Sequence, residues 1–444
     1  MSQAVRKSEF PRYLHSLRGI NNIALQGRGI PYADADRVRE HLNGRAGREL
    51  RQTVPLSELR VLGAFFTGEV LAEKVVTSAP SWPSWKFAVD PACGCGDLLL
   101  PLARQLPIGE SLGETLRQWG ECLAGVDVVP EFVDITRERL LLLAIQRGAA
   151  SRGEDRPDLR QLLPNFHVES GKGHPIIGEA DLVLINPPYG GVVAPSGTPW
   201  GAGLVTDAAL WLCATADRLK EAALIVALLP DVLRSGSRYA KWRRCIASRL
   251  AISSLTNLGQ FDRRTDIDVF ALTASKLVGS HGQSVPWPDL DGVQTTFGDH
   301  HSVMVGPVVE HRDPHTGPWV PYVTSRDLPQ SGEHTPRRSR RFRKRLFKPP
   351  FVAIRRTSRP TDGEPRIHAV VVRGDRPVAA ENHLIIVRPA RATVEECRRI
   401  AKFLESEAAT DWLNHRIRTR HLTTIAVKEI PVPPNFGRDA AVRA

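Results

Sequence analysis

Residues 181–190 read Asp-Leu-Val-Leu-Ile-Asn-Pro-Pro-Tyr-Gly, and the rest of the chain is arranged around them. The apolar run in the first half has the length of a buried parallel strand, and the two prolines end it. Asn186 therefore lies at the carboxyl end of a strand, where open α/β sheets bind their ligands. Its amide oxygen and the Pro187 carbonyl are two hydrogen-bond acceptors beside the Tyr189 ring. They suit an exocyclic amino group on a planar base, although Asn-Pro is also an ordinary turn dipeptide.

A glycine-bearing turn precedes this stretch. Residues 87–90 predict a short strand, residues 91–97 (Pro-Ala-Cys-Gly-Cys-Gly-Asp) predict a tight turn, and a helix follows. Such a turn lets a ligand approach the backbone and presents the amides of the helix start. The next strand, 122–129, carries Asp127 where it would accept both hydroxyls of a ribose. This is the order of a nucleoside-cofactor half-site, and Asp90 adds a charge that suits an ammonium-bearing ligand.

Strands and helices continue to alternate after this half-site. We expect a mostly parallel, Rossmann-like sheet of seven strands that ends in an antiparallel hairpin. The Gly- and Pro-rich residues 192–206 predict a long mobile loop beside the site. The remaining elements are predicted as helices at 130–147, 207–220 and 234–249, and as strands at 165–170, 222–229, 251–258 and 267–275.

The composition sets limits on the class of protein. A chain of 444 residues with 42% hydrophobic and 24% charged residues suggests two or three globular domains. No apolar stretch reaches the roughly 20 residues of a membrane helix, and the N-terminus lacks an apolar signal core. The six cysteines include no CxxC pair. We therefore expect a cytoplasmic protein with reduced thiols, no membrane partner and no metal.

The positive charge is concentrated in the last third of the chain. Residues 1–300 carry 33 basic and 33 acidic residues, whereas residues 301–444 carry 27 and 15. This distribution predicts a neutral catalytic body joined to a polyanion-binding domain. Residues 337–348 (RRSRRFRKRLFK) include no acid, and their two phenylalanines favour a nucleic-acid surface over a merely solvated run. The predicted DNA-binding residues there are Arg337, Arg338, Arg340, Arg341, Arg343, Lys344 and Arg345.

Four segments, in this order and spacing, resemble the gamma group of DNA adenine-N6 methyltransferases, of which the TaqI-type enzymes are examples. They are FFTGEV at 65–70, DPACGCGD at 90–97, GVD at 125–127 and NPPYG at 186–190. The resemblance covers about residues 61–277 and is weaker beyond. It implies a class I methyltransferase fold and S-adenosylmethionine (SAM) as cofactor. The residues that it implies for SAM binding are Phe65, Thr67, Asp90, Ala92, Gly94, Gly96, Asp127 and Pro188.

The resemblance also implies how a base is held. Asn186 and Pro187 would accept hydrogen bonds from adenine N6, and Tyr189 and Phe261 would stack on the extruded ring. Phe270 is the other aromatic candidate in the hairpin, and we expect it in the core. Arg263 and Arg264 lie in the turn of the predicted hairpin. They would either face DNA or be ordinary solvated turn residues.

The sequence departs from the family pattern in two places. Gly68 stands where the family usually has proline, from which we expect a looser turn. The third strand usually ends in an acid that holds the adenine of SAM, whereas this chain offers Glu169 or Ser170. The sequence assigns neither of them to that contact.

The sequence thus predicts a SAM-dependent DNA adenine-N6 methyltransferase that takes the adenine out of duplex DNA in a restriction-modification or other defence system. Its predicted parts are an N-terminal helical extension (1–60), a catalytic domain (61–277), a linker (278–300) and an α+β target-recognition domain (301–444). Double-stranded DNA is the expected partner. The sequence leaves open whether a separate nuclease or other defence-system subunit is a second partner. The alternatives are an N-methyltransferase of ribosomal RNA or of protein glutamine, and a catalytically idle DNA-binding subunit.

Overall fold

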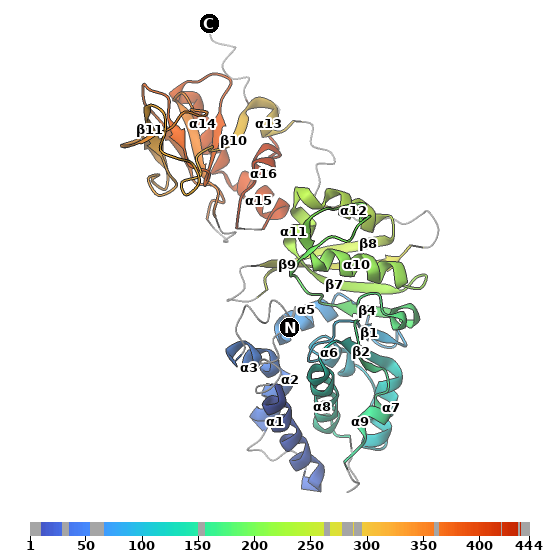
Figure 1. Cartoon of the computed structure of the whole chain (residues 1–444). Coiled ribbons are helices and arrows are strands. Elements are labelled where there is room, and N and C mark those ends of the chain that lie inside the picture. Colours follow the sequence, from blue (N-terminus) through green and yellow to red (C-terminus); the bar gives the residue numbers. More distant parts are fainter. Residues whose placement is uncertain are drawn as a thin grey trace. The chain divides into compact units, whose positions relative to one another are not determined.

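The computed structural model describes residues 10–28, 35–53, 66–149, 156–261, 267–277, 287, 295–358, 364–418, 420–433 and 436. The chain divides into two compact units (Figure 1). The first consists of Met1–Arg234 and Arg238–Trp287, and the second of Ser235–Ser237 and Pro288–Ala444. The predicted site residues Phe65, Arg263 and Arg264, and most of the predicted linker, lie outside the described residues.

A seven-stranded sheet forms the centre of the first unit. Its order is β3-β2-β1-β4-β7-β9-β8. The pairs from β3 to β7 are parallel, and β9 is antiparallel to both of its neighbours. The predicted Rossmann-like sheet of the class I methyltransferase type is therefore confirmed. The strands are β1 (Ala88–Asp90), β2 (Leu123–Asp127), β3 (Phe166–Val168), β4 (Leu182–Ile185), β7 (Leu224–Pro230), β8 (Leu250–Gln260) and β9 (Asp268–Lys276).

The sequence explains why these elements form. All four residues of β4 are buried, as expected for a central parallel strand with both faces covered. Ser111 caps the start of α7 (Leu112–Cys122) by accepting a hydrogen bond from the Glu114 amide, and Pro130 begins α8 (Pro130–Gln146). The other helices of the sheet region include α5 (Glu69–Val76), α6 (Leu99–Ala103), α10 (Asp207–Arg218) and α12 (Ala240–Ala247).

Two predicted segments differ from the structure. The predicted loop 192–206 contains a small antiparallel sheet of β5 (Gly191–Val193) and β6 (Leu204–Thr206). Three-residue strands are too short to show a periodic pattern, so the sequence did not reveal them. The predicted helix 234–249 is interrupted: it comprises the end of α11 (Asp231–Ser235), a 3-10 helix at Ser237–Tyr239, and α12.

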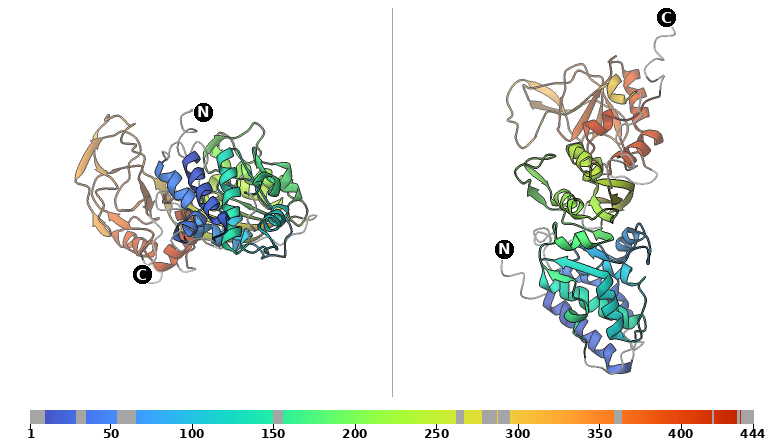
Figure 2. Two further views of the ribbon diagram at one scale, coloured as in Figure 1. Left: turned by 90° about the horizontal axis from the view of Figure 1, so that it is seen from below. Right: turned by 90° about the vertical axis from the view of Figure 1, so that its right-hand side faces the viewer.

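The N-terminal helices pack into the first unit (Figure 2). They are α1 (Phe10–Ile23), α2 (Ala35–Leu42) and α3 (Arg45–Thr53), and they lie within the segment predicted as a helical extension (1–60). The Asn21 amide nitrogen of α1 lies 2.7 Å from the buried Glu138 carboxylate of α8. The Phe10 and Phe132 rings meet edge to face at 4.9 Å. This region shares the hydrophobic core of the sheet unit.

The second unit has α+β architecture. Its larger sheet has the order β10-β17-β14-β15-β12, and its smaller sheet has the order β13-β11-β16. None of the helices in the described part of either unit has the length and apolar character that crossing a bilayer requires. The strands are β10 (Ser302–Val305), β11 (Trp319–Val323), β12 (Gly332–His334), β13 (Arg338–Arg341), β14 (Phe351–Arg355), β15 (Ala369–Val372), β16 (Ala379–Ala380) and β17 (Leu384–Arg388). The helices are α13 (Phe297–His300), α14 (Val394–Leu404), α15 (Glu407–Arg416) and α16 (Thr424–Lys428).

Candidate functional site

The site lies where the strand order of the sheet reverses. The chain runs from β1 outward through β2 to β3, and then returns to place β4 on the other side of β1. The carboxyl ends of β1 and β4 therefore diverge into a crevice, which is the usual ligand site of an open α/β sheet. Asp90 ends β1, and Asn186 directly follows β4. The fold thus brings together two residues that the sequence separates by almost a hundred positions.

Asn186 is held by a hydrogen bond that it donates to a third segment, the one that contains Thr67. Its side-chain nitrogen donates to the Thr67 hydroxyl at 2.9 Å. Because the nitrogen is engaged there, the amide oxygen is turned away from Thr67. This bond joins the NPPYG segment to the FFTGEV segment. Both were identified from sequence, and the structure places them in one site.

A small cavity is lined by four of the eight predicted cofactor residues and by Asn186. Its volume is ≈ 20 Å³, room for about one water molecule. Phe66 and the turn after β1 form part of its wall. The predicted residues that line it are Thr67, Asp90, Ala92, Gly94 and Asn186.

Asp127 holds the glycine turn in place. Its two carboxylate oxygens accept the amides of Gly94, at 3.0 Å, and Val129, at 2.9 Å. A carboxylate has about four lone-pair positions, so these bonds leave acceptor capacity on Asp127. The other face of the turn rests on α8, where the Thr136 hydroxyl donates to the Gly94 carbonyl at 2.9 Å.

Gly96 is required by close packing against the same helix. Its φ is +82°, and a Cβ there would lie 2.8 Å from the Thr136 methyl carbon. Any larger residue would push the turn away from α8. Gly96 does not line the cavity, and its predicted part in cofactor binding stays a prediction.

Asp90 lies in an unusual electrostatic environment. It is 1% exposed. Burial, together with the neighbouring carboxylates of Asp127 and Asp97, raises the pKa of Asp90 to about 8, although a hydrogen bond from the Ala92 amide opposes this. A cation bound beside Asp90 would favour its ionised form. Near neutral pH Asp90 is therefore largely protonated in the absence of a ligand, and it would ionise when a positively charged ligand binds beside it.

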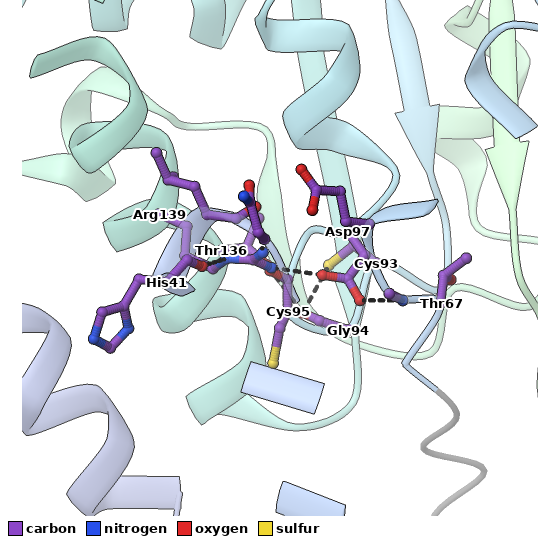
Figure 3. A network of polar contacts seen from close by, with 12 residues as sticks. His41, Thr67, Cys93, Gly94, Cys95, Asp97, Thr136 and Arg139 are labelled. Carbon is purple, nitrogen blue, oxygen red and sulfur yellow. Dashed lines mark hydrogen bonds and ion pairs between the residues drawn. The ribbon is translucent and has the colours of Figure 1, made fainter. Parts of the chain in front are cut away.

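Gly68 forms a firm turn rather than the looser one we expected. Its φ is +70°, which proline cannot adopt, and its amide donates to the Asp97 carboxylate at 3.2 Å. Asp97 in turn pairs with Arg139 of α8 at 2.8 Å (Figure 3). Proline has no N–H and could not donate this bond. The glycine that departs from the family pattern is therefore part of a hydrogen-bond network with Asp97 and Arg139. Asp97 and Arg139 are far apart in the sequence, and only the fold brings them together.

The two aromatic residues proposed to stack on a base meet in the structure. The Tyr189 and Phe261 ring centroids lie 5.8 Å apart, with their planes at 78°. Both are largely buried, and the Tyr189 hydroxyl donates to the Leu228 carbonyl at 3.1 Å. Phe270 lies in the core, as expected.

The remaining predicted positions are less close to the cavity. Pro187 is buried and Pro188 is half-buried, and neither lines the cavity. Glu169 is exposed and lies 3.3 Å from the ring nitrogen of His174. Ser170 is also exposed. The structure therefore brings neither residue to the cavity.

The basic run at 337–348 divides into exposed and buried members. Arg340 is 2% exposed, its guanidinium carbon lies 5.2 Å from the Tyr322 ring centroid, and it donates to the Asp313 carbonyl. Its position is that of a core residue. Phe342 and Phe347 are buried too, so their rings pack inside the unit and do not face a nucleic acid. The exposed basic residues are Arg337, Arg338, Arg341, Arg343, Lys344, Arg345 and Lys348.

Strand alternation accounts for the difference between Arg340 and Arg341. β13 pairs antiparallel with β11, and successive side chains point to opposite faces. Arg341 lies opposite Trp319, whose side chain is 68% exposed. A large exposed aromatic beside arginines is typical of a surface that stacks on bases. Trp319 is thus a candidate that the sequence analysis missed, since 18 residues separate it from the basic run.

Two of the exposed basic residues are ion-paired within the unit. Arg338 lies 2.9 Å from the Asp327 carboxylate, and Lys344 lies 2.5 Å from that of Asp313.

Across the described ranges, no group of three or more His, Cys, Asp or Glu side chains is arranged to hold a metal ion.

Comparisons with known proteins concern the fold. A scan against protein-family models finds no match, and a search of curated proteins finds none. Solved structures that are similar include the modification subunit assigned to a type I restriction enzyme of Vibrio vulnificus YJ016. It is 17% identical, with 60% of this chain and 51% of that chain covered and a TM-score of 0.38.

Two further solved structures match the chain. The M protein of the type I restriction enzyme EcoKI is 14% identical over 62% of this chain and 64% of that chain, with a TM-score of 0.35. The type IIL restriction-modification enzyme MmeI, solved with DNA, is 11% identical over 98% and 73%, with a TM-score of 0.46. The chain spans about half the length of two of the type I proteins that it matches. At these low identities and TM-scores, we draw no conclusion about activity from the likeness.

Proposed function

We propose that this chain is a SAM-dependent DNA methyltransferase that transfers a methyl group to N6 of an adenine turned out of duplex DNA, in a restriction-modification or other defence system. The observation that carries the proposal is the hydrogen bond between Asn186 and Thr67 at the crevice between β1 and β4. An acceptor amide, a glycine turn and a buried carboxylate meet there. That set suits an amino group on one side and a cationic nucleoside on the other.

The donor set fits SAM in its chemistry. When bound, SAM supplies a methyl group on a positively charged sulfur. Asp90 offers a buried carboxylate for the positive charge of the ligand, and Asp127 offers lone pairs for ribose hydroxyls. The glycine turn at Gly94 would bring the backbone close to the ligand.

Asn186 and Pro187 would orient the acceptor. The adenine amino group is a poor nucleophile because its lone pair is delocalised into the ring. Hydrogen bonds to the Asn186 oxygen and the Pro187 carbonyl would direct that lone pair toward the methyl group, so catalysis would consist largely of positioning. Tyr189 and Phe261 would stack on the extruded base and offset part of the few kcal/mol that unstacking costs.

DNA would bind the small sheet of the second unit. The exposed arginines around β13 would neutralise phosphates, and Trp319 would stack on a base. This assignment replaces the buried Phe342 and Phe347 with an aromatic side chain that solvent reaches.

Modified-base sequencing tests the proposal. DNA from a host that expresses the wild-type chain should carry N6-methyladenine at a defined sequence, and DNA from a host that expresses Asn186→Ala should not. Calorimetry should show SAM binding to both proteins. If the wild type does not bind SAM, the proposal is wrong. If it binds SAM and the methyl group appears in ribosomal RNA or on protein glutamine instead, the DNA substrate is wrong.

A further inference from the structure

The end of an N-terminal helix is connected to the glycine turn through one buried arginine. Arg139 is 1% exposed, and its guanidinium is surrounded by acceptors (Figure 3). Its Nε donates to the His41 carbonyl at 2.8 Å, and its Nη2 donates to the Leu42 carbonyl at 3.3 Å. These are the last two residues of α2, whose final carbonyls have no partner within the helix. Arg139 therefore caps α2 where the helix dipole favours a cation.

The same guanidinium reaches the candidate cofactor site. Its Nη1 donates to the Cys95 carbonyl in the glycine turn and to the Asp97 carboxylate, the latter at 2.8 Å. The second oxygen of Asp97 accepts the Gly68 amide. Gly68 directly follows Thr67, which holds Asn186. Hydrogen bonds thus connect α2 through Arg139 and Asp97 to the segment that positions Asn186.

α2 is itself fixed from the other side. The His41 ring nitrogen lies 3.0 Å from the Tyr13 hydroxyl of α1, and burial together with nearby arginines lowers the pKa of His41 to about 3. His41 therefore stays neutral, and its ring adds no positive charge next to Arg139. The α1 helix is held to α8 by Asn21 and Arg18, which both bond to Glu138.

We propose that Arg139 and Asp97 are positioning residues of the SAM site, and that through them the N-terminal helices hold the glycine turn and the Thr67 segment in their binding geometry. This inference rests on the proposed function, since SAM is the ligand whose site is positioned. Arg139 touches neither the cavity nor the Asn186 side chain, so its effect would pass through Asp97 and Cys95. The N-terminal region would then be part of the cofactor site rather than an appendage.

Two conservative variants test the network in the full chain. Arg139→Lys keeps the charge but replaces the five-donor fork with a single ammonium, which cannot reach the α2 carbonyls and Asp97 together. Asp97→Asn keeps the shape and an acceptor for Gly68 but removes the ion pair. Each should weaken SAM binding in calorimetry by about 10-fold, and the double variant should be little worse than either single one. The KM for SAM should rise while kcat at saturating SAM stays within about 3-fold.

Arg147→Met is the matched control. Arg147 follows α8, donates to the Ala103 carbonyl at 2.7 Å and stacks on Trp119, away from the turn. It should lower stability without changing SAM affinity. A general loss of folded protein would lower kcat in all three variants and leave the KM for SAM unchanged.

Amide hydrogen exchange gives a readout that does not need SAM. Exchange at the Gly68 amide should become faster in Arg139→Lys and in Asp97→Asn, whereas the amides in the middle of α8 should keep their protection. If Gly68 exchange and SAM affinity both match the wild type, the positioning role is wrong even though SAM binds. If the wild-type protein does not bind SAM at all, the proposed function fails, and the inference fails with it. If Arg139→Lys does not fold, the isosteric Asp97→Asn variant still decides the question.

Discussion

Two regions stand out equally in the sequence: the glycine turn with its partner strands, and the basic run at 337–348. In the fold, the side chains of the first region come together, whereas those of the second are separated. In the first region, residues from three distant segments converge on one cavity. In the second, neighbours along the chain are separated, because β13 sends Arg340 into the core and Arg341 to the surface. The end of a parallel strand fixes where a residue lies. A run of residues of the same type does not show which of them a strand will bury. The two regions are therefore tested with different experiments.

The largest effect is expected at Asn186. Asn186→Ala should lower single-turnover methyl transfer by about 100-fold or more, because it removes a positioned acceptor for the amino group. SAM affinity should change little in calorimetry, since the glycine turn and Asp127 remain. Asn165→Ala, which loses a bond to the Gly120 carbonyl, is the control and should keep wild-type rates. A wild-type rate in Asn186→Ala would show that the convergence of segments in the first region does not position the amino group through Asn186.

The basic run offers a matched comparison within twelve residues. Replacing Arg337, Arg343 and Arg345 with Gln should weaken DNA binding by about 10- to 100-fold at moderate salt. It should also reduce the slope of log affinity against log salt by about 2–3, since each phosphate contact contributes about 0.9. Arg340→Met should leave the slope unchanged and instead destabilise the second unit by about 1–2 kcal/mol, through its lost hydrogen bond and aromatic contacts. Fluorescence anisotropy and urea unfolding separate the two effects, and equal slopes for both variants would contradict the division of the run.

Trp319 provides the aromatic test. Trp319→Ala should cost about 1–3 kcal/mol of DNA binding, the usual value of a base stacked on an aromatic side chain. Stability should hardly change, because the ring is exposed. Phe347→Leu is the counterpart on the buried side, and it should lower stability with unchanged DNA affinity. If the Phe347 variant lost DNA affinity instead, the sequence-based expectation for the phenylalanines would be restored.

The smallest effect concerns Asp90 and pH. Its pKa in the folded chain is about 8, against an ordinary value of 3.8, so between these pH values the folded protein binds more protons than the unfolded chain. Stability should therefore fall as pH rises through this window. Asp90→Asn should remove this loss and be more stable than the wild type by about 1–2 kcal/mol at pH 8, with little difference near pH 4, while SAM affinity falls. Asp36→Asn on the surface is the control, and parallel pH profiles for wild type and Asp90→Asn would contradict the shift.

The sequence predicted the sheet well because its strands carry two signals at once. β4 is an apolar run bounded by a turn, and the acids at 90 and 127 mark strand ends. Strand ends are local features, and the topology of a parallel sheet then gathers them at one edge. The convergence of Asp90 and Asn186 could be predicted for this reason.

Other features depend on tertiary contacts that no local pattern contains. Arg139 stands in a helix with two further buried charged residues, Arg137 and Glu138, and the sequence gives no reason to choose between them. The Gly68 amide has its partner 29 positions away. The position of Trp319 opposite Arg341 follows from strand register, which the basic run alone does not specify. These residues were found only when the fold was known.

The order of strands at one edge of the sheet has a consequence for synthesis of the chain. β9 lies between β7 and β8 and pairs with both, although it is the last of the three to be made. Until residue 276 has left the ribosome, β7 keeps an open, fully apolar edge, and β8 has no neighbour in the sheet. Nascent chains that stall between residues 230 and 268 would expose an adhesive strand edge and would be substrates for chaperones. The sheet is complete only when its final strand is inserted between two that are already made.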